Sequence, residues 1–260
     1  MEGTNTAGAN NRLIAVTGAN RGIGAATALE LARRGFTVAC LTREGRGVRS
    51  PPVPGEMAGR MIHLVCDVTD EEGVKRALGE AAEQGQAMGA GGLWGLVNNA
   101  GIHLAGPSAA VSSEDFAEVL AVNTTALFRV CREAYPLLKA DGGGIIVNMG
   151  SFFDKVGAPR NTAYAASKAA VGAITRCLAV EWAPDGITVL NVAPGYIETE
   201  LNREFLARES VREYLLPRIP VGRPGTPGEV ARLVAALFTE NIPYFTGETI
   251  YMDGGQSIAH

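Results

Sequence analysis

The segment Thr17-Gly18-Ala19-Asn20-Arg21-Gly22-Ile23-Gly24 joins a short apolar run to a long helical one. The run before it, Leu13–Thr17, is apolar, and the run after it repeats apolar residues at helical spacing. Glycines at such a turn let backbone amides approach a phosphate group, and the start of the helix adds a partial positive charge. A tight turn from strand to helix also needs glycine for steric reasons, so the spacing alone is weak evidence for a nucleotide site.

Outward from this turn, short apolar runs alternate with longer segments rich in Ala, Leu, Glu and Arg. The alternation predicts an α/β fold, with a Rossmann-like, doubly wound parallel sheet and helices on both faces. The predicted strands are Leu13–Thr17, Thr37–Thr42, Met61–Cys66, Gly95–Asn98, Gly144–Met149, Thr188–Val192 and Thr249–Met252. The predicted helices are Ile23–Arg34, Glu71–Gln84, Ser113–Leu138, Asn161–Trp182, Leu201–Leu216 and Pro227–Phe238.

The length of 260 residues favours one undivided domain. We expect residues 1–11 to form a disordered tail and residues 12–260 to form a single dinucleotide-binding and catalytic domain. Glu44–Arg60 and Gly85–Gly92 are rich in proline or glycine, which predicts surface loops. The last helix is expected to begin with a capping box, because Thr226 and Glu229 flank a proline at the first helical position.

Composition excludes several classes of protein. A formal charge of -4 argues against a general nucleic-acid binder. No signal-peptide pattern and no long uncharged apolar stretch is present, which indicates a cytoplasmic protein with no membrane partner. The four cysteines are scattered and are interpreted as reduced core thiols, and no His, Asp or Glu cluster has the spacing of a metal site.

The most informative residues follow the strand that ends at Met149. Ser151 lies just beyond its carboxyl edge, where ligands of open α/β sheets bind, and can hydrogen-bond a substrate oxygen. Tyr164 and Lys168 are four residues apart on a predicted helix, so both side chains act on one site. A phenol is a weak acid at neutral pH, and we expect the Lys168 ammonium to lower the pKa of Tyr164.

The second strand ends in Thr42, where a site specific for NAD usually carries an acidic residue. Arg43 follows, and Arg21 lies inside the glycine turn, so two guanidinium groups can converge where NADP carries its extra phosphate. NADP(H) is therefore favoured over NAD(H). The alternative is that either arginine is only a solvated surface charge, and a proline-rich loop after Arg43 could hold its side chain away from the phosphate.

Taken in order, the motifs from Leu13 to Gly255 resemble those of the short-chain dehydrogenase/reductase family. They are the glycine turn, Asp67-Val68, Asn98-Asn99-Ala100-Gly101, Asn123, Ser151, Tyr164 to Lys168, and Pro194-Gly195-Tyr196-Ile197-Glu198-Thr199. A Tyr-x-x-x-Lys pair alone is a common accident in helices, whereas the ordered set is highly specific. The resemblance implies an oxidoreductase that moves a hydride between a nicotinamide and a carbonyl or secondary alcohol.

The resemblance also assigns roles residue by residue. Tyr164 would exchange a proton with the substrate oxygen, Lys168 would hold the nicotinamide ribose, and Asn123 would anchor a water that relays protons. The residues expected at the cofactor are Gly18, Asn20, Arg21, Gly22, Ile23, Gly24, Arg43, Asp67, Val68, Asn99, Ala100, Gly101, Tyr164, Lys168, Pro194, Gly195, Ile197 and Thr199. Without the ordered motifs, Asn123 and Asp67 would be interpreted as residues that satisfy backbone groups.

Substrate residues are less well defined by the sequence. Ser151, Phe153, Tyr164 and Tyr196 are expected to line the substrate pocket. His103 could lie at its edge, whereas His63 is expected in the core. Residues 200–220 fall where the family places a mobile lid, and their arginines, Arg203, Arg208, Arg212 and Arg218, either attract an anionic substrate or form a solvated helix face.

The segments Ala193–Leu201 and Tyr251–Gly255 resemble those of 3-oxoacyl-carrier-protein reductases and gluconate 5-dehydrogenases, and both substrate types remain open. The resemblance also implies a homotetramer that pairs the helices near Ser113–Leu138 and Asn161–Trp182. A catalytically idle NADP(H)-binding sensor is the alternative function.

Overall fold

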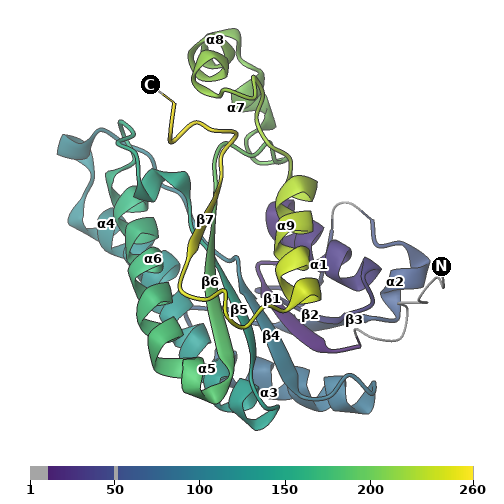
Figure 1. The fold of residues 1–260 in the computed structure, drawn as a ribbon. Coiled ribbons are helices and arrows are strands. Elements are labelled where there is room, and N and C mark those ends of the chain that lie inside the picture. The colour runs from purple at the N-terminus through teal and green to yellow at the C-terminus, as the bar shows by residue number, and fades with distance from the viewer. Residues whose placement is uncertain (1–10, 50–51, 260) are drawn as a thin grey trace.

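A computed structural model describes residues 11–49 and 52–259, and most of the predicted tail 1–11 lies outside that part of the chain. Its centre is a seven-stranded sheet in the order β3-β2-β1-β4-β5-β6-β7 (Figure 1). Every neighbouring pair of strands is parallel, which confirms the predicted α/β fold. The strands are β1 Leu13–Thr17, β2 Thr37–Thr42, β3 Met61–Val65, β4 Leu93–Asn98, β5 Gly144–Met149, β6 Ile187–Pro194 and β7 Thr249–Met252.

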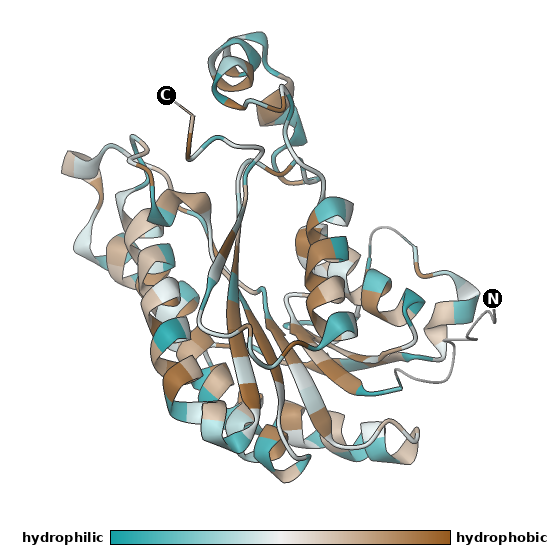
Figure 2. Cartoon of the chain, viewed as in Figure 1, coloured by the Kyte–Doolittle hydropathy of each residue, from teal (hydrophilic) through white to brown (hydrophobic). Residues whose placement is uncertain are grey.

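Helices cover both faces of the sheet, so β1, β2, β4 and β5 are buried along their whole length. One face packs against α3, α5 and α6, and the other packs against α1 and α9 (Figures 1 and 2). The helices are α1 Gly22–Arg33, α2 Gly55–Ala58, α3 Glu71–Ala87, α4 Ser113–Leu120, α5 Leu127–Ala140, α6 Thr162–Trp182, α7 Arg203–Ala207, α8 Glu209–Leu215 and α9 Pro227–Glu240. No described helix is both long and apolar enough to cross a membrane.

A row of polar side chains crosses four neighbouring strands of the sheet. Asn98, Asn148, Asn191 and Thr249 are in register on β4, β5, β6 and β7. Asn98 Nδ2 donates to Asn148 Oδ1 (3.0 Å), and Asn148 Nδ2 donates to Thr175 Oγ1 on α6 (3.0 Å). Hydrogen bonds between buried polar groups fix one arrangement, because leaving either group unpaired is costly. The row therefore sets the position of α6 along β5, and α6 carries both Tyr164 and Lys168.

The predicted helix Ser113–Leu138 is interrupted. A π-helical turn, Ala121–Ala126, joins α4 to α5. Such a turn contains one extra residue and frequently marks a functional site, and here it contains Asn123. The predicted helix Leu201–Leu216 is likewise two short helices, α7 and α8, which lie beyond the carboxyl ends of the strands (Figure 1).

The two predicted loops are partly helical. Within Glu44–Arg60, α2 forms directly after Pro54, because a proline at the N-cap costs no helical hydrogen bond. Within Gly85–Gly92, α3 continues to Ala87. Gly85 is accommodated there because a Cβ would lie 2.7 Å from a methyl carbon of Leu13, so glycine permits the close packing of α3 on β1.

Two further expectations from the sequence were wrong. His63 is exposed rather than in the core, because β3 is an edge strand and alternate side chains on it face solvent. Cys177 lies exposed on α6, whereas Cys40, Cys66 and Cys131 are buried free thiols as expected.

The predicted capping box of α9 is confirmed, and its contribution to stability can be measured. Thr226 Oγ1 accepts from Glu229 N (3.3 Å), and Glu229 Oε2 accepts from Thr226 N (2.9 Å). We expect Thr226→Ala to lower the free energy of unfolding by about 1 kcal/mol, because an N-cap acceptor is lost. Urea denaturation followed by circular dichroism measures the change. Thr226→Ser keeps the hydroxyl and is the control; equal losses in both variants would show that the cap contributes little.

Candidate active site

The glycine turn, residues 17–24, adopts a backbone that only glycine takes readily. Gly18 and Gly22 have φ angles of +65° and +57°. A Cβ on Gly24 would clash with the Gly18 carbonyl oxygen, so the turn also needs glycine for close packing. The start of α1 follows at Gly22 with no acidic residue in its first turn. This arrangement suits an anionic phosphate, since the amides at a helix start are free to donate.

Thr17 and Asn99 hold the glycine turn against the end of β4. Thr17 Oγ1 accepts from the backbone N of Asn99 and of Ala100, each at 3.0 Å. Asn99 Nδ2 donates to the carbonyl oxygens of Thr17 (3.1 Å) and Gly18 (3.2 Å). The Asn99 side chain therefore shapes the turn from behind. Its spacing in the sequence gives no indication of this role, which needs the pairing of β1 with β4.

Lys168 lies at the carboxyl edge of β5. Its side chain is buried, and Nζ donates to the carbonyl oxygen of Met149 (2.8 Å). The same nitrogen lies 5.6 Å from the centroid of the Tyr164 ring. The predicted pair thus shares one face of α6, as their spacing requires. The acceptor at Met149 was not foreseen, because a backbone carbonyl carries no signal in the sequence.

Ser151 meets Tyr164 from the end of β5. Ser151 is buried and begins the short helical turn Phe152–Asp154, where its Oγ accepts from Phe153 N (3.3 Å). Its side chain also hydrogen-bonds the Tyr164 side chain. The structure therefore brings Ser151, Tyr164 and Lys168 to one place.

The pKa of Tyr164 differs from the value expected from its spacing to Lys168. Burial raises the pKa of the Tyr164 phenol above its ordinary value, and the hydrogen bond with Ser151 opposes that rise only in part. Burial also lowers the pKa of Lys168 to about 8. The expected lowering of the Tyr164 pKa by Lys168 is therefore not found: burial dominates, and Ser151 rather than Lys168 opposes it.

Asn123 is fully buried in the π-helical turn, and its amide bridges three segments. Nδ2 donates to Ile102 O (2.9 Å) and to Ser167 Oγ (3.1 Å), and Oδ1 accepts from Ile102 N (2.8 Å). A Cβ on Gly101 would lie 3.0 Å from Asn123 Oδ1 and 3.8 Å from Lys168 Nζ. Asn123 therefore satisfies backbone groups, as its interpretation without the ordered motifs would have it. It lies close to Lys168.

Aromatic rings surround Tyr164. Its ring meets His103 edge to face at 4.7 Å and Phe153 at 6.1 Å. Phe153 also meets Tyr196 at 5.9 Å. All the side chains predicted for the substrate pocket therefore gather in one cluster, and His103 lies at its edge, as the sequence left open.

Arginines near the glycine turn and the end of β2 differ in whether their side chains are paired. Arg21 and Arg43 are exposed, and their side chains make no hydrogen bond or ion pair with the described residues. Glu44 pairs with Arg49 and with Arg46 (3.6 Å), so its charge is offset locally. The backbone N of Arg49 donates to Asn20 O (2.9 Å), which ties the loop after β2 to the glycine turn. The described part of this loop does not bind the Arg43 side chain.

Two polar residues, Thr42 and Asp67, lie near Arg43. Thr42 Oγ1 is buried without a partner, at the end of β2. Asp67 Oδ1 accepts from the backbone and hydroxyl of Thr69, which lowers the pKa of its carboxyl, and Arg43 lowers it further. Asp67 thus caps its own turn, and Val68 follows it half-buried.

The segment after β6 closes over the glycine turn. A Cβ on Gly22 would lie 3.6 Å from a Thr199 methyl carbon. Gly195 N donates to Met252 O (3.0 Å), which anchors the Pro194–Gly195 turn to β7. Ile197 is buried and pairs with Gly225, and Thr199 donates to Asn202 Oδ1 from both its N (2.7 Å) and its Oγ1 (3.2 Å).

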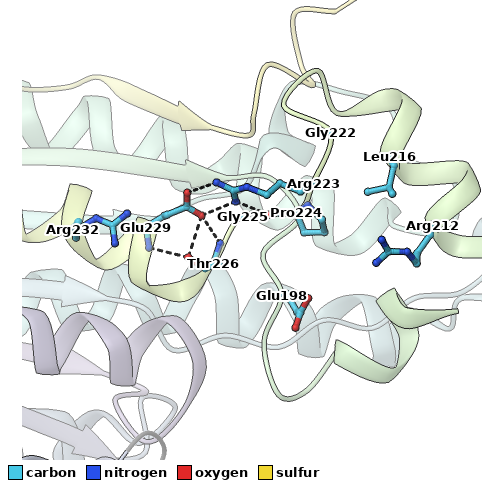
Figure 3. A pocket seen from close by; sticks show the side chains of 10 residues that line it. All are labelled: Glu198, Arg212, Leu216, Gly222, Arg223, Pro224, Gly225, Thr226, Glu229 and Arg232. Carbon is cyan, nitrogen blue, oxygen red and sulfur yellow. Dashed lines mark hydrogen bonds and ion pairs between the residues drawn. The ribbon is translucent and has the colours of Figure 1, made fainter.

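A cavity of about 510 Å³ lies between this segment, α8 and the start of α9. Its walls include Glu198, Arg212, Leu216 and Arg232, and Figure 3 shows Arg232 at one end of the group of lining residues and Arg212 at the other. None of the predicted catalytic residues lines this cavity. It lies under residues 200–220, and we interpret it as space beneath these helices rather than as the reaction site.

The arginines of residues 200–220 are mostly engaged locally. Arg203 pairs with Glu198 (3.2 Å), Arg208 lies 5.9 Å from the Phe205 ring centroid, and Arg218 lies 3.9 Å from that of Tyr214. Arg212 borders the cavity. These contacts favour a solvated helix face over attraction of an anionic substrate.

The sequence matches a protein-family model and a known dehydrogenase. Residues 18–257 match a family model described as enoyl-(acyl carrier protein) reductase. Glucose 1-dehydrogenase of Gluconobacter oxydans is 39% identical over 250 residues, which cover 94% of this chain and 91% of that protein.

Two solved structures are similar along nearly their whole length. A short-chain type dehydrogenase/reductase from Mycobacterium marinum has a TM-score of 0.87 at 31% identity and covers 98% of both chains. A putative 2-deoxy-D-gluconate 3-dehydrogenase from Agrobacterium tumefaciens with bound NADP has a TM-score of 0.84 at 34% identity, and covers 97% of this chain and 99% of its own.

The buried ammonium of Lys168 leads to a prediction about stability. Its pKa falls from 10.5 to about 8 on folding, so the folded state disfavours the charged form. That cost is fully present below the folded pKa and disappears as pH rises through the unfolded pKa. We expect Lys168→Met to be at least as stable as the unchanged protein at pH 7, and to lose about 2 kcal/mol of that relative stability by pH 10.

Urea denaturation of both proteins without cofactor, at the two pH values, measures the difference. Groups that titrate in both proteins cancel in the comparison. A stability difference that does not change with pH would show that Lys168 keeps its ordinary pKa.

Proposed function

The chain belongs to the short-chain dehydrogenase/reductase family of oxidoreductases, and on this premise we propose that it transfers a hydride between NADP(H) and a carbonyl or secondary alcohol. The observation that carries the proposal is the convergence of Ser151, Tyr164 and Lys168 at the carboxyl edge of β5. A phenol, a hydroxyl and an ammonium at one point are the groups that proton transfer to a carbonyl oxygen requires.

In the proposed reaction Tyr164 is the general acid and base. Its raised pKa keeps the phenol protonated at neutral pH, which suits donation to a carbonyl oxygen during reduction. Ser151 would orient the same oxygen by a hydrogen bond. Bound NADPH would supply the hydride, a chemistry that belongs to the nicotinamide. Asn123 would hold a water that returns the proton, and Lys168 would bind the nicotinamide ribose.

We propose NADP(H) rather than NAD(H) as the cofactor. The side chains of Arg21 and Arg43 are exposed and form no hydrogen bond or ion pair with the described residues, and Thr42 stands where an acidic residue would repel a phosphate. The relative with bound NADP supports the same choice. The glycine turn would hold the pyrophosphate, and Asp67 and Val68 would meet the adenine. Asn99 to Gly101 would flank the cofactor, and Ile197 and Thr199 would meet the carboxamide.

We propose two classes of substrate. The 3-oxoacyl type agrees with the acyl-carrier description of the family model, and the sugar or sugar-acid type agrees with the names of two relatives. Phe153 and Tyr196 would line the pocket beside Ser151, and residues 200–220 would form its lid. A cytoplasmic location and the absence of nucleic-acid binding stay predictions from the sequence.

We also propose a homotetramer that pairs α5 and α6. Both helices carry exposed apolar side chains, Phe128 on α5 with 40% and Val180 on α6 with 81% of its surface accessible. A symmetric oligomer buries the same patch on each partner, so such residues suit a self-complementary interface.

Replacing Tyr164 tests the reaction. We expect Tyr164→Phe to lower kcat by about 10²–10⁴-fold while NADPH affinity changes little, because the proton donor is lost and the binding surface is kept. A screen of ketones and aldehydes with NADPH, followed by loss of nicotinamide absorbance, measures turnover; fluorescence titration measures affinity. Full activity in the variant would refute the role of Tyr164. Silence of the unchanged protein across the screen, with tight NADPH binding, would favour the sensor.

Replacing Arg43 tests the cofactor choice. We expect Arg43→Asp to lower the ratio of kcat/KM for NADPH to that for NADH by about 10- to 100-fold, since a charged partner is exchanged for a repulsive one. Arg46→Asp makes the same charge change at an arginine already paired with Glu44, and serves as the control. A ratio that falls equally in both variants would indicate a general field effect rather than a contact at Arg43.

A further inference from the structure

The His103 side chain lies in contact with Tyr164 and is open to solvent. It follows β4 and the Asn98 to Gly101 segment, and its ring meets the Tyr164 ring edge to face at 4.7 Å and 77°. Because the side chain is exposed, a molecule that approaches the Tyr164 hydroxyl can reach the imidazole as well. The proposed reaction gives this residue no role.

The hydrogen bonds around Asn161 define the protonation of the imidazole. Asn161 Nδ2 donates to the carbonyl oxygen of Pro159 (2.8 Å), which can only accept, so the orientation of the amide is fixed. Asn161 Oδ1 then faces His103 Nε2 at 2.6 Å. An amide oxygen can only accept, so Nε2 carries the proton. In the neutral ring Nδ1 is therefore an acceptor, and it has no hydrogen-bond partner among the described residues.

His103 is held in place by more than this one bond. The loop that carries it is joined to the loop before α6 by two further contacts. Gly106 N donates to Arg160 O (2.9 Å), and the hydroxyls of Ser108 and Thr162 lie 2.6 Å apart. Arg160 has a φ of 70°, an unfavourable value for a residue with a side chain, so the surrounding contacts impose its conformation. The imidazole is thus fixed before any substrate binds.

The neighbours of the Tyr164 ring differ in chemistry. Phe153 contacts the Tyr164 ring and also meets Tyr196, and both present aromatic surface. His103, which is bound to Asn161, contacts the Tyr164 ring as well and presents nitrogen and oxygen. A substrate whose carbonyl oxygen lies at Tyr164 would place one substituent against the rings and the other against the imidazole.

We propose that His103, held by Asn161, is a specificity-determining residue that accepts a hydrogen bond from a hydroxyl on the carbon next to the reacting carbonyl. The proposal rests on the proposed oxidoreductase function and selects hydroxylated carbonyl compounds within it. A site that offers an acceptor favours a substrate that carries the matching donor, because the analogue without it displaces water and leaves the acceptor unpaired. Since the imidazole is exposed, the preference is modest, about tenfold.

Matched ketones with and without this hydroxyl provide the test. Hydroxyacetone and butanone form one pair, in which a methyl group replaces the hydroxyl, and 2-hydroxycyclohexanone and cyclohexanone form the other, in which a hydrogen replaces it. We expect the unchanged enzyme with NADPH to prefer the hydroxylated member of each pair by about tenfold in kcat/KM. We expect His103→Phe to abolish this preference mainly through a higher KM for the hydroxylated ketone, because a binding contact is lost while a ring remains against Tyr164.

Two variants separate this role from a structural one. Asn161→Ala frees Nε2 and should weaken the preference without a change in kcat for the unsubstituted ketone. His63→Phe makes the same substitution on the exposed edge strand β3 and should leave both ketones unaffected. If His103→Phe lowers kcat/KM for both members equally, His103 only supports the Tyr164 ring and the proposal is overturned.

The outcome also separates this proposal from the one it rests on. Equal rates on both members of each pair, with activity lost in Tyr164→Phe, would overturn the role of His103 and leave the oxidoreductase function intact. No turnover of any carbonyl compound in the screen would overturn both.

Discussion

The hydrogen bond from Lys168 Nζ to the Met149 carbonyl joins α6 to the sheet. It places a buried charge at the carboxyl edge of β5, where burial makes the ammonium unfavourable and lowers its pKa to about 8. Tyr164 lies one helical turn earlier on the same face, and Ser151 lies two residues beyond Met149. The relative positions of the three groups therefore depend on how α6 is set along β5.

Several independent contacts keep that arrangement rigid. The hydrogen bond between Asn148 and Thr175 fixes α6 to β5, and the hydrogen bond between Asn123 and Ser167 fixes it to the π-helical turn. At the other end of the site, Thr17 and Asn99 hold the glycine turn to β4. All of these side chains are buried or half-buried, where an unpaired amide or hydroxyl is costly, so each contact favours a single geometry. Ser151, Tyr164 and Lys168 thus rest on a layer of hydrogen-bonded polar side chains.

The surroundings of Tyr164 determine how its phenol behaves. Burial raises its pKa, so the protein without cofactor keeps a protonated donor rather than a phenolate. The rings of Phe153 and His103 both contact the Tyr164 ring, and Phe153 also contacts Tyr196. In the proposed reaction, the side chains that surround the phenol would also be the ones that a substrate meets.

The sequence by itself determined the α/β class, all seven strands and the pairing of Tyr164 with Lys168, because these depend on periodicity and local spacing. Only the tertiary structure decided the π-helical turn at Asn123, the exposure of His63 and Cys177, and the acceptor at Met149. It also decided the direction of the Tyr164 pKa shift and the placement of His103 against Asn161. These features depend on which segments pack together and how much water they exclude, and neither is encoded in the spacing of residues along one segment.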